Sequence, residues 1–362
     1  MTILSKTHRS SLRNGLAGLT TVVLISCTLV GSHPASAETA DRLRGLVSPV
    51  VAKKPIKIGV TVVHLQDDFW KGIAYGIADE AKLSNVTVAQ TTVAGAYGNV
   101  TQQFAQIQAM QTLGVDVAVV GPAAYDGYDA ILAGLKKSGI TVIAAGIPLN
   151  SKNVDFGITQ DDTALGGTLA DAVCKDMAGK PAEVLALPGP AGAEWSRLRF
   201  VGFTERAKSC PGMTVFSGPV GGAVDIGYGL SQVSDMLLKH PDAKYAYTPE
   251  SALGMGAAQA GRRQHKEMKV ATATLNDQGL TELKDGRFLT VISEPGILIG
   301  RLIVQYAIRK AEGLPMPSMQ ATSPYPTVVV PNLPVTQSMA ATYDDSIYDV
   351  PPKSWSIEAV QK

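Results

Sequence analysis

The sequence predicts an α/β protein built as two doubly wound lobes that are joined by crossing segments. Short apolar runs typical of buried strands alternate with longer segments whose apolar residues recur at three- and four-residue spacing, as they do in helices. This alternation favours parallel sheets with helices on both faces. About ten strands are expected, and that number suits two sheets better than one.

The elements follow one another in a regular order. Strands are expected at residues 56–63, 87–92, 115–120, 141–145, 156–158, 182–187, 213–217, 243–247, 269–275, 289–293 and 328–330. Helices are expected at residues 69–84, 99–113, 128–138, 164–177, 195–209, 226–240, 252–263, 279–284 and 297–312. Glycines such as Gly114 and Gly139 stand just after the periodic runs, where helices commonly end.

Composition narrows the class of protein. The chain has 362 residues, of which 45% are hydrophobic, and its net charge is +1. This length permits two domains with sizeable cores. A net charge so close to zero gives no electrostatic reason to expect nucleic acid as a partner.

The N-terminal residues 1–37 have the pattern of an export signal. A basic start is followed by an apolar stretch at residues 16–30 and by a small-x-small site at residues 34–37, so cleavage is expected before Glu38. Two alternatives are a lipoprotein signal ending at Cys27 and an uncleaved anchor. The mature protein is therefore expected in the periplasm, where Cys174 and Cys210 either pair as a disulfide or remain two buried thiols.

Catalytic and metal-binding patterns are missing from the sequence. The mature chain keeps His64, His240 and His265, and these do not have the spacing of a metal site. There is no GxSxG elbow and no phosphate-binding GxxxxGK[ST] loop. We therefore expect a protein that is not an enzyme and that uses no metal or cofactor; an exported α/β enzyme is the alternative of a different class.

The loop after the first strand is the strongest candidate for a binding site. It carries Asp67, Phe69 and Trp70 past the carboxyl end of that strand, which is where open α/β sheets bind ligands. Because two adjacent aromatic residues are not expected to face one core, at least one should contact a ligand. The alternatives are that the rings fasten the helix to the sheet and that Asp67 caps the helix.

The chain resembles the type I periplasmic binding proteins over roughly residues 54–331. The segments that carry the resemblance are DDFWKGIAYG, GVDVAVVGP, GITVIAAG, RLRFVGFTER and YTPESALGMGA, in this order. Within that family the chain is most similar to the TorT-type proteins of trimethylamine-N-oxide sensing, through VTQQFAQIQAM, LALPGPAGA and KHPDAKYAY.

The resemblance implies two Rossmann-like lobes joined by a three-strand hinge, with a cleft that closes on one small solute. Lobe 1 would comprise residues 55–157 and 295–322, and lobe 2 residues 158–294 and 323–335. The hinge crossings would lie near residues 157–159, 294–295 and 323–326. Residues 336–362 would form a C-terminal tail on the surface.

The resemblance also implies a set of ligand-binding residues. Asp67, Phe69 and Trp70 stand where sugar-binding members have an asparagine and two aromatic residues, and Arg199 matches an arginine of the second lobe. The remaining candidates are Trp195, Thr248, Thr274 and Glu294. The last three replace amides and a carboxylate that read sugar hydroxyls, which argues against a pentose or hexose.

Several of these residues have a second interpretation. Arg199 is either a ligand clamp or part of a surface salt bridge, and Trp195 lies either in the cleft or on the surface. Glu294 is either a hinge residue or a ligand contact. The expected function is a periplasmic solute-binding protein that presents its ligand to a membrane partner, as a TorT-like sensing component. That partner would be a sensor histidine kinase ectodomain or, in the transport alternative, the permease of an ABC transporter.

Overall fold

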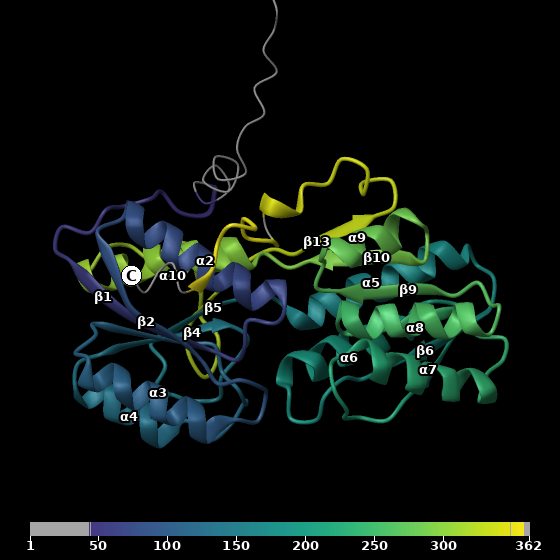
Figure 1. Cartoon of the computed structure of the whole chain (residues 1–362), viewed down its shortest axis with the longest axis horizontal. Coiled ribbons are helices and arrows are strands. Elements are labelled where there is room, and N and C mark those ends of the chain that lie inside the picture. The colour runs from purple at the N-terminus through teal and green to yellow at the C-terminus, as the bar shows by residue number, and fades with distance from the viewer. Residues whose placement is uncertain (1–42, 44, 348, 358–362) are drawn as a thin grey trace, which may run out of the picture. The chain divides into compact units, whose positions relative to one another are not determined.

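A computed structural model describes residues 43, 45–347 and 349–357 of the chain. The export signal expected at residues 1–37, with its two alternatives, lies outside the described residues. Figure 1 shows the described elements. None of the described helices combines the length and the apolar composition that a membrane span needs.

The first sheet has the strand order β11-β12-β5-β4-β3-β1-β2. All its pairs are parallel except that of β11 with β12. Its strands are β1 (Ile56–Val62), β2 (Val86–Val93), β3 (Val117–Val120), β4 (Thr141–Gly146), β5 (Phe156–Thr159), β11 (Met319–Gln320) and β12 (Thr327–Val329). The central strands are almost wholly apolar and buried, as strands covered on both faces are.

The second sheet repeats this order, as β13-β10-β9-β8-β6-β7. Its pairs are parallel except that of β13 with β10. Its strands are β6 (Ala182–Ala186), β7 (Met213–Ser217), β8 (Tyr245–Tyr247), β9 (Lys269–Ala273), β10 (Phe288–Ser293) and β13 (Leu333–Thr336). The predicted fold class, an α/β protein with two doubly wound sheets, is confirmed.

Helices cover the sheets in packed pairs. In the first half, α2 packs on α10 and α3 on α4, and these two pairs lie on opposite faces of the sheet (Figure 1). In the second half, α5 packs on α6 and α7 on α8. The helices are α2 (Asp68–Leu83), α3 (Val100–Thr112), α4 (Asp129–Lys137), α5 (Asp162–Met177), α6 (Glu194–Ala207), α7 (Ile226–Lys239), α8 (Ser251–Arg263), α9 (Asp277–Lys284) and α10 (Gly296–Glu312).

Glycine allows α5 and α6 to approach each other closely. A Cβ atom added to Gly166 would lie 1.9 Å from the carbonyl oxygen of Arg199, and one added to Gly202 would lie 2.0 Å from that of Thr163. Only a residue without a side chain fits these positions. The two glycines therefore set the distance at which α6 presents Arg199.

The chain passes between the sheets after β5, between β10 and α10, and between β12 and β13. The expected third crossing near residues 323–326 is wrong, because β12 pairs with β5, with Val328 opposite Ile158. Residues up to Val329 thus stay with the first sheet, and the crossing follows them. The other lobe boundaries stay a prediction.

The C-terminal tail does not simply lie on the surface, as was expected. Ile347 and Asp349 are buried. The Oγ atom of Ser293, at the end of β10, donates to Asp349 Oδ1 and Oδ2 at 2.9 Å, and Tyr343 Oη donates to Asp349 Oδ2 at 2.7 Å. Trp355 then packs against Tyr75 of α2, with ring centroids 5.8 Å apart. The tail therefore connects the second sheet to a helix of the first.

Two of the three cysteines form a disulfide. Cys174, in α5, is bonded to Cys210, just after α6, and their Cα atoms are 5.8 Å apart. The question that the sequence left open is thus decided in favour of the disulfide, which fixes the far ends of α5 and α6 to each other.

Candidate ligand-binding site

A cavity of about 870 Å³ lies between the two sheets, lined by residues that follow β1, β3, β6, β8 and β9. In each sheet the strand order reverses between the first and the third strand along the chain, β1 and β3 in one and β6 and β8 in the other. Loops at the carboxyl ends of such strands diverge and leave a crevice. The two crevices open into the same space, so both halves of the fold bound the cavity. It is called the central cavity below.

Phe69 and Trp70 form part of one wall and are also core residues. Trp70 is fully buried, and its ring lies where a side chain on Gly121, just after β3, would stand. Phe69 and Ile73 together fill the corresponding place at Gly146, at the end of β4. The expectation that adjacent aromatic residues would not face one core is wrong, because two neighbouring strands end beneath them and each ring covers one. Both residues nevertheless line the central cavity.

Tyr97 extends this aromatic wall. Its hydroxyl accepts a hydrogen bond from Trp70 Nε1 at 3.3 Å, and its ring lies 5.6 Å from that of His64 and 6.0 Å from that of Trp195. Trp195 lies in the cavity wall and is only 5% exposed, so its surface interpretation is wrong. Its Nε1 atom has no hydrogen-bond partner among the described residues.

Arg199 is the centre of a buried ion-pair cluster and not part of a surface salt bridge. Its Nε atom donates to Asp162 Oδ1 at 2.8 Å, its Nη1 atom donates to the carbonyl oxygen of Pro249 at 2.9 Å, and its Nη2 atom donates to Glu294. The Arg199 side chain is 3% exposed, and its guanidinium lies 4.8 Å from the Trp195 ring centroid. Burial alone would lower the pKa of Arg199, but the carboxylates of Glu294 and Asp162 raise it above its usual range.

Glu294 joins this cluster to the crossing segments. Besides Arg199 it accepts hydrogen bonds from Gln160 Nε2, just after β5, and from Thr274 Oγ1, just after β9. Thr274 has a φ of +63°, a left-handed conformation that is strained for a β-branched residue. Glu294 therefore lies beside a crossing and also lines the cavity, and its expected contact with a ligand stays a prediction.

Thr248 is the sequence candidate that the structure places away from the cavity. It is fully buried, and its Oγ1 donates to Thr272 Oγ1 at 2.8 Å and to the carbonyl oxygen of Glu250 at 3.2 Å. It is absent from the described residues that line the central cavity. Glu250 and Ala252, a little further along the chain, do line the cavity, and Glu250 is the polar residue that sequence reasoning missed.

Asp67 and Glu250 cap two helices whose first turns face the cavity. Asp67 Oδ1 accepts from Trp70 N at 2.9 Å, and Glu250 Oε2 accepts from Ala252 N at 2.7 Å. Burial raises the pKa of Asp67 to about 7 and that of Glu250 to about 8. The cap interpretation of Asp67 is correct, and the same residue lines the cavity. An acidic residue between a strand and a helical pattern was the signal that could have found Glu250.

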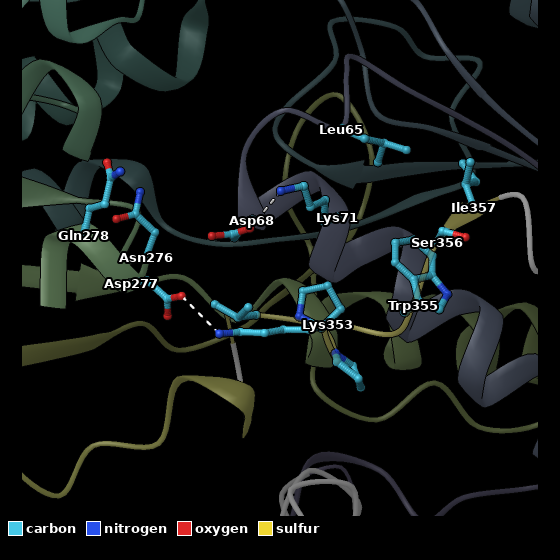
Figure 2. Close-up of a pocket in the computed structure, with 13 residues that line it drawn as sticks. Leu65, Asp68, Lys71, Asn276, Asp277, Gln278, Lys353, Trp355, Ser356 and Ile357 are labelled. Atoms are coloured by element: carbon cyan, nitrogen blue, oxygen red, sulfur yellow. Dashed lines mark hydrogen bonds and ion pairs between the residues drawn. The ribbon is translucent and has the colours of Figure 1, made fainter.

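A second hollow, of about 510 Å³, lies beside the first and is lined in part by the C-terminal tail (Figure 2). Lys353 of the tail pairs with Asp277 at 3.7 Å, and Lys71 pairs with Asp68 at 3.1 Å. Asp68, Lys71 and Asn276 line both hollows. Within the described part of the chain, no group of His, Cys, Asp and Glu residues is arranged to hold a metal ion.

The chain is similar to several known solute-binding and periplasmic proteins. The chain is 50% identical to the solved substrate-binding protein of a sugar ABC transport system from Bordetella parapertussis 12822, with a TM-score of 0.83, over 87% of this chain and 100% of that one. It is 25% identical to the ribose import binding protein RbsB of Bacillus subtilis, over 70% of this chain and 81% of that protein. It is 26% identical to the periplasmic protein TorT of Escherichia coli K12, over 74% of this chain and 76% of that protein.

The family match covers most of the sequence. Residues 58–315 match the model of the periplasmic binding protein domain. The family and the fold are those of solute-binding proteins, and the likeness to type I periplasmic binding proteins seen in the sequence is confirmed. The chain therefore belongs to the periplasmic binding protein domain family.

Proposed function

We propose that this protein works in the periplasm as a solute-binding protein, which holds one small polar solute in the central cavity and presents it to the permease of an ABC transporter. The observation that carries the proposal is the position of the cavity, which is lined by loops from the carboxyl ends of both sheets. A solute bound there contacts both halves, so its binding energy favours the closed arrangement of the hinge.

The transport role is favoured over other roles by the relative from Bordetella parapertussis, which is 50% identical over its whole length. A second candidate is a sensing role, in which the solute-bound protein contacts the ectodomain of a sensor histidine kinase. The 26% identity to TorT supports this candidate. A strain that lacks the gene would lose uptake of the labelled solute in the first case, and would lose a solute-dependent transcriptional response in the second.

Binding itself is tested by thermal-shift screening of the purified mature chain against sugars, amino sugars, amines, osmolytes and organic acids. A solute present at 100 times its Kd stabilises the folded state by about 2.7 kcal/mol. Trp195→Ala should reduce this shift, because Trp195 lines the cavity, whereas Trp355→Ala should keep it, because Trp355 does not. If no solute from any class raises the melting temperature and a hydrolase screen detects turnover, the exported-enzyme alternative replaces this proposal.

A further inference from the structure

Three carboxylates that line the central cavity have no lysine or arginine partner among the described residues; Asp225 is exposed, whereas Asp67 and Glu250 are not and come from different halves of the fold. Asp67 follows β1 and Glu250 follows β8. Their hydrogen bonds come only from uncharged groups: Trp70 N for Asp67, and Ala252 N and Ser251 Oγ, at 3.1 Å, for Glu250. Among the described residues, neither carboxylate forms an ion pair with a lysine or an arginine.

The cations of the cavity wall are already paired. Lys71 pairs with Asp68, and Arg199 pairs with Asp162 and Glu294. His64 Nδ1 lies 3.6 Å from Asp67 Oδ2, but burial lowers the pKa of His64, so the ring stays neutral at pH 7. The protein itself therefore supplies no lysine or arginine as a counterion for Asp67 or Glu250.

Ionisation of Asp67 and Glu250 is unfavourable in the empty protein. Burial raises the pKa of both carboxyl groups, and the charge of Asp67 raises that of Glu250 further. A positive group placed between them would favour their ionised forms. Because the two residues come from different sheets, the same group would also join the two halves of the cleft.

A hydrogen-bond donor in the same wall gives independent evidence for a ligand. Trp195 is 5% exposed, lines the cavity, and its Nε1 atom has no acceptor among the described residues. Buried indole N–H groups normally have a partner. The acceptor would be an oxygen of a ligand in the cavity, reached when the cleft closes, because the Nε1 atom itself is buried in the empty protein.

We propose that the ligand is a small protonated amine that carries hydroxyl groups, such as an amino sugar or an amino polyol, whose N–H groups donate to Asp67 and Glu250. An oxygen of the same ligand accepts from Trp195 Nε1. This inference rests on the proposed function and names the ligand class of that site. It distinguishes such amines from neutral sugars, which carry no charge, and from quaternary ammonium compounds and amine oxides, which have no N–H to donate.

Isothermal titration calorimetry of the mature chain in phosphate buffer at pH 7.5 tests the inference with matched probes. The probes are D-glucosamine with D-glucose, D-galactosamine with D-galactose, and trimethylamine N-oxide. At least one amino sugar should bind ten-fold or more tightly than its neutral counterpart. Asp67→Asn and Glu250→Gln should each weaken amine binding by ten-fold or more and leave neutral probes unaffected.

The chain offers a matched control for these variants. Asp161 also caps a helix, by accepting from Ala164 N at 2.9 Å, but it is exposed and is not among the described residues that line the cavity. Asparagine caps a helix as well as aspartate does, so Asp67→Asn and Asp161→Asn both keep their caps. Asp161→Asn should change amine affinity by less than two-fold.

Each outcome has a distinct meaning. If a neutral sugar or trimethylamine N-oxide binds as tightly as the amines, or if amine binding ignores both substitutions, the amine inference is overturned and the solute-binding function stands. If no compound of any class binds, the proposed function itself fails. If Asp67→Asn does not fold, Glu250→Gln, on the other half of the fold, provides the same comparison.

Discussion

Replacing Arg199 by methionine should destabilise the protein strongly. The substitution leaves the side chains of Asp162 and Glu294, which are 1% and 3% exposed, without their cation. Breaking a buried ion pair by removing one partner costs about 3–5 kcal/mol. With an unfolding entropy of about 2.1 cal/mol/K per residue over about 320 residues, the melting temperature should fall by about 5–7 °C.

The assay is thermal unfolding followed by circular dichroism at pH 8, with a charge-free variant as control. In Arg199→Met/Asp162→Asn/Glu294→Gln no ion remains buried in the cluster, so most of the lost stability should return. The deficit of the single variant should also shrink on acidification. Burial raises the pKa of Asp162 to about 6, and a protonated carboxyl needs no cation.

Two results would refute this reasoning. One is a loss of less than about 1 kcal/mol in Arg199→Met, which is the range of an exposed ion pair. The other is a charge-free variant no more stable than the single one, which would show that hydrogen bonds and packing, not the uncompensated charge, dominate the effect.

Three further predictions concern the close approach of α5 to α6, the buried Glu250 and the disulfide. Gly166→Ala should lower the free energy of unfolding by about 1–3 kcal/mol, because its Cβ would lie 1.9 Å from the carbonyl oxygen of Arg199. The control is Gly167→Ala, whose Cβ has no neighbour nearer than 3.9 Å and which should not lower it. Equal denaturant midpoints for the two variants would contradict this. The melting temperature of Glu250→Gln, measured relative to that of the natural chain, should increase as the pH rises from 5 to 8. Glu250 keeps its proton to about pH 8 in the folded state and releases it near pH 4.5 in the unfolded state. Between these values the folded state binds more protons, so the natural chain loses stability as the pH rises, and the variant does not. A difference in melting temperature that does not depend on pH would contradict the raised pKa. Cys174→Ser/Cys210→Ser should lose up to about 4 kcal/mol, the loop-closure value for a separation of this length, and an unchanged urea midpoint would show that the bond adds no stability.

The fold was predictable because its signals are local and repeated. Buried parallel strands read as apolar runs, and helices that pack on them carry apolar residues at helical spacing, so element type and order follow from the sequence. The third crossing was misplaced because β12 has only three residues, Thr327–Val329, and a short strand does not reveal which sheet it joins. Sheet membership depends on contacts with β5, which is far away in the sequence.

The candidate site was only partly predictable. The loop after β1 was found because its position past a strand end is visible in the sequence. Glu250 was missed and Thr248 was chosen instead, although only one residue, Pro249, lies between them. The backbone conformation at the end of a strand decides which side chain turns toward the cavity, and the sequence does not reveal that conformation. Arg199 was placed at the site, but its partners Asp162 and Glu294 are 37 and 95 residues away in the sequence. No sequence pattern predicts an ion-pair cluster between residues so far apart.

The central claim is that the two halves of the fold close on a solute in the central cavity. Small-angle X-ray scattering of the mature chain, with and without a saturating concentration of the tightest solute from the titrations, tests it most directly. We predict that the solute lowers the radius of gyration of the natural chain and has a smaller effect on Trp195→Ala at the same concentration. A scattering profile that is the same with and without the bound solute would contradict closure.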